Sequence, residues 1–185
     1  MTRERTTADL LGYRPPTPGR VRRLLASAAS TRPVSRVLAR TLPGLDRALA
    51  RGTGGRASAP GIVVGLPTVV LRTVGARTGL VRETTLIPVP VGSDLAVIGS
   101  NFGGARTPAW VFNLRARPEA VLVHGRREVA VRARLLAGEE RERALATARR
   151  TYRGYGSYQH RAAHRELCVF ALEPLPRAGD DDGPG

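Results

Sequence analysis

The chain has 185 residues, a formal net charge of +15 and an apolar content of 42%. This length suits one domain with appendages and is enough to bury a core. The single cysteine, Cys168, excludes an internal disulfide, and no stretch has the length of a membrane span or the apolar centre of a signal peptide. We therefore expect a cytoplasmic protein.

The positive charge suggests a nucleic-acid partner, but the type of basic residue that supplies this charge weakens the suggestion. All 30 basic residues are arginine, and Ala, Gly, Val and Leu are abundant, as expected of a GC-rich coding sequence. Much of the charge is therefore compositional, and we expect no nucleic-acid partner. Guanidinium groups still fork well onto phosphate and carboxylate, so a polyanionic small molecule remains an option.

The first 60 residues are predicted to be appendages. Residues 1–19 are polar, contain prolines and lack periodicity, which predicts a disordered arm. Residues 20–60 hold two amphipathic helices, Val21–Ser30 and Val34–Leu49, followed by a Gly-rich linker. Their apolar faces alternate with arginine. Docking on the body of the protein is the favoured interpretation, and peripheral contact with an anionic membrane is the alternative.

Residues 61–176 are β-rich, and residues 177–185 form an acidic tail. Pro88 and Pro90 place the second predicted strand at a sheet edge or bulge. Thr107 is predicted as an N-cap and Pro108 as the first helical residue of a helix over Ala109–Ala116; a second helix is predicted over Glu139–Arg150. The strands are predicted at Thr68–Val74, Glu83–Val91, Leu95–Ser100, Ala120–His124, Arg127–Leu136 and Leu167–Leu172. Because no βαβ repeat occurs, the pattern predicts an α+β, mainly β, split antiparallel barrel of about six strands with helical insertions.

The loop between the first two strands carries the first motif, Gly75–Arg82. Its glycines permit positive φ and let backbone N–H groups converge on an anion. Arg77 and Arg82 can fork onto phosphate, and Thr78 adds a hydroxyl. The spacing fits neither a P-loop nor a dinucleotide fingerprint. Alone, the motif is also compatible with a solvated hairpin turn.

The second motif, Gly99–Trp110, combines a strand end, a glycine turn and a helix start. This arrangement presents N–H groups and a positive dipole to an anion or a ring carbonyl. Ser100 and Asn101 lie in the turn, and Trp110 lies in the first helical turn. For Trp110, core packing is an equally weighted alternative.

The third motif gathers three of the four tyrosines, Tyr152, Tyr155 and Tyr158. Tyrosine offers a flat apolar ring and a polar tip, which suits a pocket for a planar ligand; the alternative is that the rings pack a helix onto the sheet. His160 and His164 are spaced as on one helix face, but no third ligand accompanies them. We therefore predict no metal site.

Taken together, the runs TxGARTGxxR, GSNxGGxxxPAWxxNLxxxP, GEER, YxxYxxYQ and LEP resemble the deazaflavin-dependent nitroreductase family over about Leu66 to Pro174. Members of that family are small split barrels that use coenzyme F420. A departure is Cys168, where members often carry proline. The resemblance implies that the first motif holds the phosphate end of the cofactor, through Arg77, Thr78, Gly79 and Arg82 together with Thr73 and Gly75.

The resemblance further implies that Ser100, Asn101 and Trp110 flank the deazaflavin ring. Tyr152, Tyr155 and Tyr158 would cover the acceptor pocket and, with Ser100, form the catalytic set. The implied activity is hydride transfer from reduced F420 to a small conjugated acceptor, namely a quinone, a nitroaromatic or an activated alkene, including a biosynthetic intermediate. The alternatives are a non-catalytic barrel that carries F420 or FMN, with FMN the less favoured cofactor, and a basic nucleic-acid binder. A homo-oligomer is left open.

Overall fold

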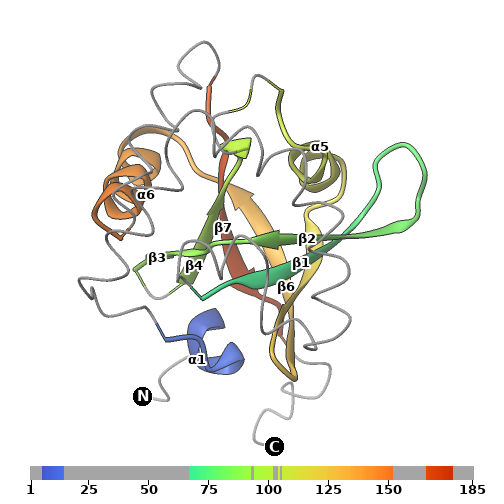
Figure 1. The fold of residues 1–185 in the computed structure, drawn as a ribbon, viewed down its shortest axis with the longest axis horizontal. Helices are drawn as coiled ribbons and strands as arrows, with labels where there is room; N and C mark the ends of the chain where they lie inside the picture. Colours follow the sequence, from blue (N-terminus) through green and yellow to red (C-terminus); the bar gives the residue numbers. More distant parts are fainter. Residues whose placement is uncertain are drawn as a thin grey trace, which may run out of the picture.

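A computed structural model describes residues 6–14, 67–92, 94–101, 104, 106–151 and 166–176. The predicted helices and linker of residues 20–60 and the predicted acidic tail therefore lie wholly outside the described residues. The described chain builds one antiparallel sheet that curls into a split barrel (Figure 1). The predicted mainly β fold is confirmed.

The sheet has seven strands in the described part of the chain, in the order β2-β1-β5-β6-β7-β4-β3. Every neighbouring pair is antiparallel. The strands are β1 (Val69–Val74), β2 (Val81–Leu86), β3 (Val89–Val91), β4 (Asp94–Ile98), β5 (Glu119–His124), β6 (Arg127–Leu135) and β7 (Val169–Pro174).

The second predicted strand is wrong in one respect, because Glu83–Val91 is two strands rather than one. The chain leaves β2 after Leu86 and begins β3 at Val89, at the opposite edge of the sheet. Pro88 lies at the break, since proline lacks an N–H and restricts the residue before it. Pro90 is tolerated inside β3 because β3 is an edge strand. Seven strands therefore replace the predicted six.

Alternation along the strands divides the core into two layers. Leu95 and Val97 of β4 belong to the large cluster inside the barrel, whereas Ala96 between them packs with α6 on the outside. β7 alternates in the same way, with Phe170 inside and Ala171 outside. α6 (Gly138–Thr151) covers this outer layer with small side chains that allow close approach. Its boundaries agree with the predicted helix to within one residue.

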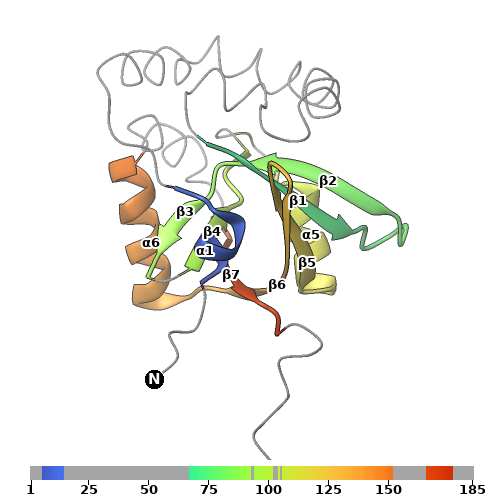
Figure 2. The ribbon, with the colours of Figure 1, turned by 90° about the horizontal axis from the view of Figure 1, so that it is seen from below.

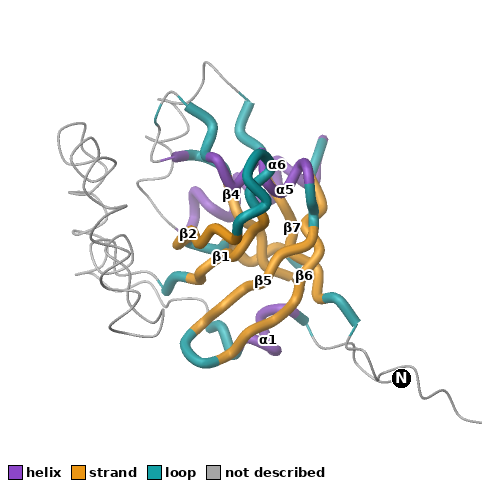
Figure 3. Tube along the Cα trace, turned by 90° about the vertical axis from the view of Figure 1, so that its right-hand side faces the viewer, coloured by secondary structure: helices purple, strands orange, loops and turns teal. Residues whose placement is uncertain are grey.

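Helix α5 (Ala109–Ala116) has the predicted boundaries, but its cap differs from the prediction. The N-cap is Pro108, whose backbone is extended and whose carbonyl accepts the first helical bond from the amide of Val111. Thr107 therefore lies one position outside the helix and makes no capping bond. α5 lies at the end of the barrel opposite the turn between β5 and β6, whereas α6 flanks the outside of the sheet (Figures 1 and 3).

The prediction that residues 1–19 are disordered is wrong for residues 6–14. These form helix α1 (Thr7–Leu11), which Thr6 caps at its start and Gly12 ends with a φ of +61°. α1 lies against the barrel beside the β5–β6 turn (Figure 2), with Leu11 and Tyr13 in the main core. A five-residue helix is too short to show a period of 3.6 in the sequence and is stable only through tertiary packing.

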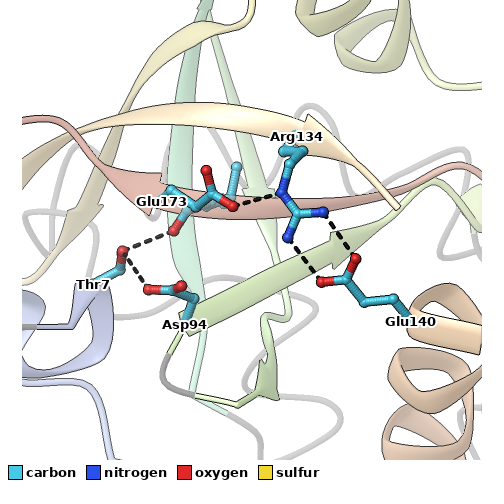
Figure 4. A network of polar contacts seen from close by, with 6 residues as sticks. Thr7, Asp94, Arg134, Glu140 and Glu173 are labelled. Carbon is cyan, nitrogen blue, oxygen red and sulfur yellow. Dashed lines mark hydrogen bonds and ion pairs between the residues drawn. The ribbon is translucent and has the colours of Figure 1, made fainter. Parts of the chain in front are cut away.

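A polar network connects this end of the barrel to α6 (Figure 4). The hydroxyl of Thr7 donates to the carbonyl of Leu172 at 2.7 Å and lies 3.5 Å from a carboxylate oxygen of Asp94. Burial raises the pKa of Asp94, and the hydrogen bonds from Thr7 oppose that shift. Arg134 on β6 binds Glu173 on β7 and forks onto Glu140 of α6. The network therefore links α6 to β6 and β7 at the surface, beside the buried contacts of Ala144, Leu145 and Ala148 with the sheet.

The docking of α1 makes a prediction about stability. Leu11 is 1% exposed, so replacing it by Ala should lower the free energy of unfolding by about 2–5 kcal/mol. The matched control is Leu80→Ala, because Leu80 is 59% exposed and its truncation should cost little. Urea denaturation of both variants measures the difference. Equal, small effects would mean that α1 is not docked in solution.

Candidate functional site

The β1–β2 loop (residues 75–80) projects beyond the barrel on the side of α5 (Figures 1 and 2). The amide of Gly75 donates to the carbonyl of Leu80 at 2.9 Å, and the amide of Gly79 donates to the carbonyl of Gly75 at 2.8 Å. Gly79 has a φ of +67°, and a Cβ on Gly75 would lie 2.6 Å from the hydroxyl oxygen of Thr78. The loop therefore needs glycine at both positions.

This loop leaves a set of hydrogen-bond donors for a ligand. Within the described residues, the backbone N–H groups of Arg77 and Thr78 have no acceptor, and the exposed side chains of Arg77 and Arg82 have no carboxylate partner. Arg72 and Arg134 differ, because each is bound by two glutamates, whereas Arg126 in the β5–β6 turn resembles Arg77 and Arg82 in having no carboxylate partner among the described residues. The unpaired donors fit an anion such as a phosphate or a carboxylate.

Asn113 of α5 anchors the β1–β2 loop through hydrogen bonds from its buried side chain. Its side chain is buried, its Oδ1 accepts from the amide of Ala76 at 3.0 Å, and its Nδ2 donates to the hydroxyl of Thr73 at 3.0 Å. Thr73 is itself 2% exposed, so its hydroxyl serves this internal contact. Asn113 is part of the sequence run PAWxxNL, but sequence reasoning assigned it no role. The sequence feature that could have indicated its role is a polar amide side chain among the apolar residues that form the buried face of α5.

The second loop (residues 99–108) runs from the end of β4 to α5. Asn101 has a φ of 47°, its carbonyl accepts from the amide of Gly104 at 2.8 Å, and its Nδ2 donates to the carbonyl of Arg106 at 3.0 Å. A Cβ on Gly104 would lie 2.9 Å from Nδ2 of Asn101. Asn101 therefore shapes this loop while remaining exposed. Ser100 lies beside it and is half-buried.

Trp110 lies in the core rather than at the surface. It is 3% exposed and meets Phe170 edge-to-face, with ring centroids 6.0 Å apart. This placement is the packing arrangement that the sequence left as an alternative. Trp110 thus supports α5 from inside the barrel, and direct contact with a ligand would require its neighbours to move.

Helix α5 brings the two loops together. Asn113 contacts the β1–β2 loop at Ala76, and Val111 contacts the second loop at Gly99, where an added Cβ would lie 2.9 Å from the Val111 side chain. The predicted anion site and the predicted ring site are thus carried by one helix. Tyr152, Tyr155 and Tyr158 lie outside the described residues and directly follow α6.

Two further properties concern the described ranges alone. None of their helices is long and apolar enough to cross a membrane. Among the same residues, no group of three or more His, Cys, Asp or Glu side chains could hold a metal ion.

Comparison with known proteins places this arrangement in a family. Residues 46–174 match the F420H(2)-dependent quinone reductase family. The chain belongs to this family. The family is named for its donor, reduced coenzyme F420, and for its acceptor, a quinone. The predicted membership of an F420-dependent split-barrel family is thereby confirmed, under the narrower label of quinone reductases.

Relatives of known sequence and structure agree with this assignment. The F420H(2)-dependent quinone reductase of Mycobacterium tuberculosis is 34% identical over 92 residues, as is a putative one of Mycobacterium bovis; the match spans 49% of this chain and 60% of each relative. The chain therefore matches less than two thirds of the length of these curated relatives.

Two solved structures share both the fold and detectable sequence identity. An F420-H2 dependent reductase, FDR-A, is 33% identical with a TM-score of 0.52, and the match covers 57% of this chain and 93% of that one. A second structure, described as a domain-swapped dimer, is 30% identical with a TM-score of 0.54, and the match covers 69% and 96%.

Proposed function

We propose that this family member is an F420H2-dependent oxidoreductase that reduces a quinone. The single observation that carries the proposal is the donor set of the β1–β2 loop and the adjoining start of β2, where Arg77, two backbone amides of the loop and Arg82 of β2 lack partners within the described residues. These donors fit the anionic phospholactyl-glutamate tail of F420, which carries a phosphate and carboxylate groups. Family membership supplies the redox chemistry that this geometry alone does not specify.

The residues of the chain have separate tasks in this proposal. Arg77 and Arg82 bind the anionic end by charge-assisted hydrogen bonds, and Gly75 and Gly79 let the backbone approach it. Ser100 and Asn101, in the loop that opens α5, face the ring end, and Trp110 supports that loop from the core. When bound, reduced coenzyme F420 supplies the hydride, so the chain needs no nucleophile of its own.

The acceptor side of the site is assigned to Tyr152, Tyr155 and Tyr158. Reduction of a quinone adds a hydride and a proton, and negative charge grows on the acceptor oxygen as the hydride arrives. A tyrosine hydroxyl can donate a hydrogen bond or a proton to that oxygen. The same chemistry would serve a nitroaromatic or an activated alkene, including a biosynthetic intermediate, and we place these acceptors second because the family is named for quinones. The dimeric relative supports a homo-oligomer for this chain as well.

The proposal predicts which cofactor the protein selects. The family to which the chain belongs is named for reduced F420, so F420 should bind in preference to FMN. Fluorescence titration of the purified protein with each cofactor measures this preference. A yellow protein that purifies with stoichiometric FMN would refute it and would favour the related flavin-binding barrels. A protein that binds F420 but never oxidises its reduced form would instead be a non-catalytic carrier.

A further inference from the structure

Asn113 occupies a position that no direct ligand contact explains. It is 7% exposed, and both ends of its amide are committed to partners far away in the sequence, Ala76 and Thr73. A buried amide is costly unless it is satisfied, and here both bonds measure 3.0 Å. These bonds fix the orientation of the side chain, because a reversed amide would set donor against donor at Ala76.

The bond to Ala76 bears directly on the donors of the β1–β2 loop. Ala76 is the first exposed residue of that loop, and its amide points to Asn113 instead of to a ligand. The next two amides, of Arg77 and Thr78, are those without an acceptor in the described residues. Holding one peptide group restricts the peptide groups that follow it, because each residue has only two soft dihedrals. Asn113 therefore presets the direction of the unpaired amides.

We infer that Asn113 is a positioning residue that preorganises the β1–β2 loop for the anionic end of the cofactor and couples this loop, through α5, to the loop of residues 99–108. The coupling has a physical route, because α5 contacts the second loop through Val111 at Gly99. This inference rests on the proposed function. Its effect is on binding, because an unanchored loop must be ordered at the moment the ligand binds.

The test compares Asn113→Ala and the near-isosteric Asn113→Leu with Thr73→Val. The Asn113 variants remove the bond to Ala76, whereas Thr73→Val removes only the bond to Thr73 and leaves the loop anchored. We expect the dissociation constant for F420 to rise by about tenfold or more in the Asn113 variants and by less than about threefold in Thr73→Val. The effect should appear in the dissociation constant for F420 more than in turnover at saturating F420, because an unanchored loop is ordered in the binding step.

Melting temperatures separate this role from a purely structural one. A folded Asn113→Leu protein with an unchanged dissociation constant would overturn the inference. A second outcome would also overturn it: the dissociation constant for F420 rises in proportion to the loss of melting temperature, and it does so in Thr73→Val as much as in the Asn113 variants. A wild-type protein that binds no F420 would overturn the proposed function together with this role.

Hydrogen exchange on the wild-type protein keeps the inference testable even if the Asn113 variants do not fold. The Ala76 amide should exchange slowly without ligand, and the amides of Arg77 and Thr78 should become protected only when F420 is added. Fast exchange at Ala76 in the free protein, or no added protection at Arg77 and Thr78 under saturating F420, would contradict the role of Asn113.

Discussion

Replacing Arg77 or Arg82 by Ala should weaken F420 binding by about 1.5–3 kcal/mol each, roughly a 10- to 150-fold rise in dissociation constant. Both side chains are exposed and have no carboxylate partner within the described residues, so their donors are available to the anionic tail of the cofactor. Titration of each variant with F420, followed by fluorescence, measures the loss.

The matched control for these variants is Arg126→Ala. Arg126 is also exposed, and it lies in the β5–β6 turn. The antiparallel register of β1 with β5 places that turn at the opposite end of the barrel from the β1–β2 loop. Its loss changes the net charge equally, so it corrects for the long-range field of a +15 protein. Unchanged binding in both loop variants, or an equal loss in Arg126→Ala, would remove the loop from the cofactor site.

Replacing Tyr155 or Tyr158 by Phe should lower turnover by roughly 10- to 100-fold, with F420 affinity little changed. The substitution keeps the ring and removes the hydroxyl, so it removes one hydrogen bond to the acceptor oxygen as charge develops there. Steady-state rates with a quinone, together with melting temperatures, measure the effect for Phe and Ala variants at Tyr152, Tyr155 and Tyr158.

The Ala variants distinguish a site from a core in the tyrosine experiment. If the rings only pack a helix onto the sheet, Phe variants will be silent, and Ala variants will lose activity in step with stability. That outcome would assign the tyrosines to the core and move the acceptor site elsewhere. Retained stability with lost turnover would assign the hydroxyls to the chemistry.

The sequence predicted those parts of the fold that depend on local chemistry. β6 alternates buried and exposed residues, so its strand was readable from a period of two, and the boundaries of α5 followed from Pro108 before an apolar run. The break after Leu86 was predicted only in part. Pro88 and Pro90 indicated an edge strand or a bulge, but proline does not specify that the chain crosses to the opposite edge of the sheet. α1 was missed because its stability comes from contacts with strands that lie at least 80 residues away.

The candidate site shows the same division. The glycines and arginines of the β1–β2 loop could be predicted, because their conformational freedom and charge are properties of the residues themselves. The role of Asn113 could not be predicted, because it depends on α5 lying beside a loop some 37 residues earlier. Thr73 and Trp110 were named as cofactor contacts, but the structure places both side chains in the interior. Whether a side chain faces in or out follows from packing that a motif does not encode.

The central claim, that this chain transfers hydride from reduced F420 to a quinone, is tested most directly by stopped-flow mixing. Protein loaded with F420H2 under anaerobic conditions is mixed with a soluble quinone, and the return of the oxidised F420 signal is followed. We predict a rapid single turnover that depends on the protein and yields one quinol for each F420H2 consumed. Oxidation no faster than in the absence of protein, across a panel of quinones and with F420H2 demonstrably bound, would contradict the claim.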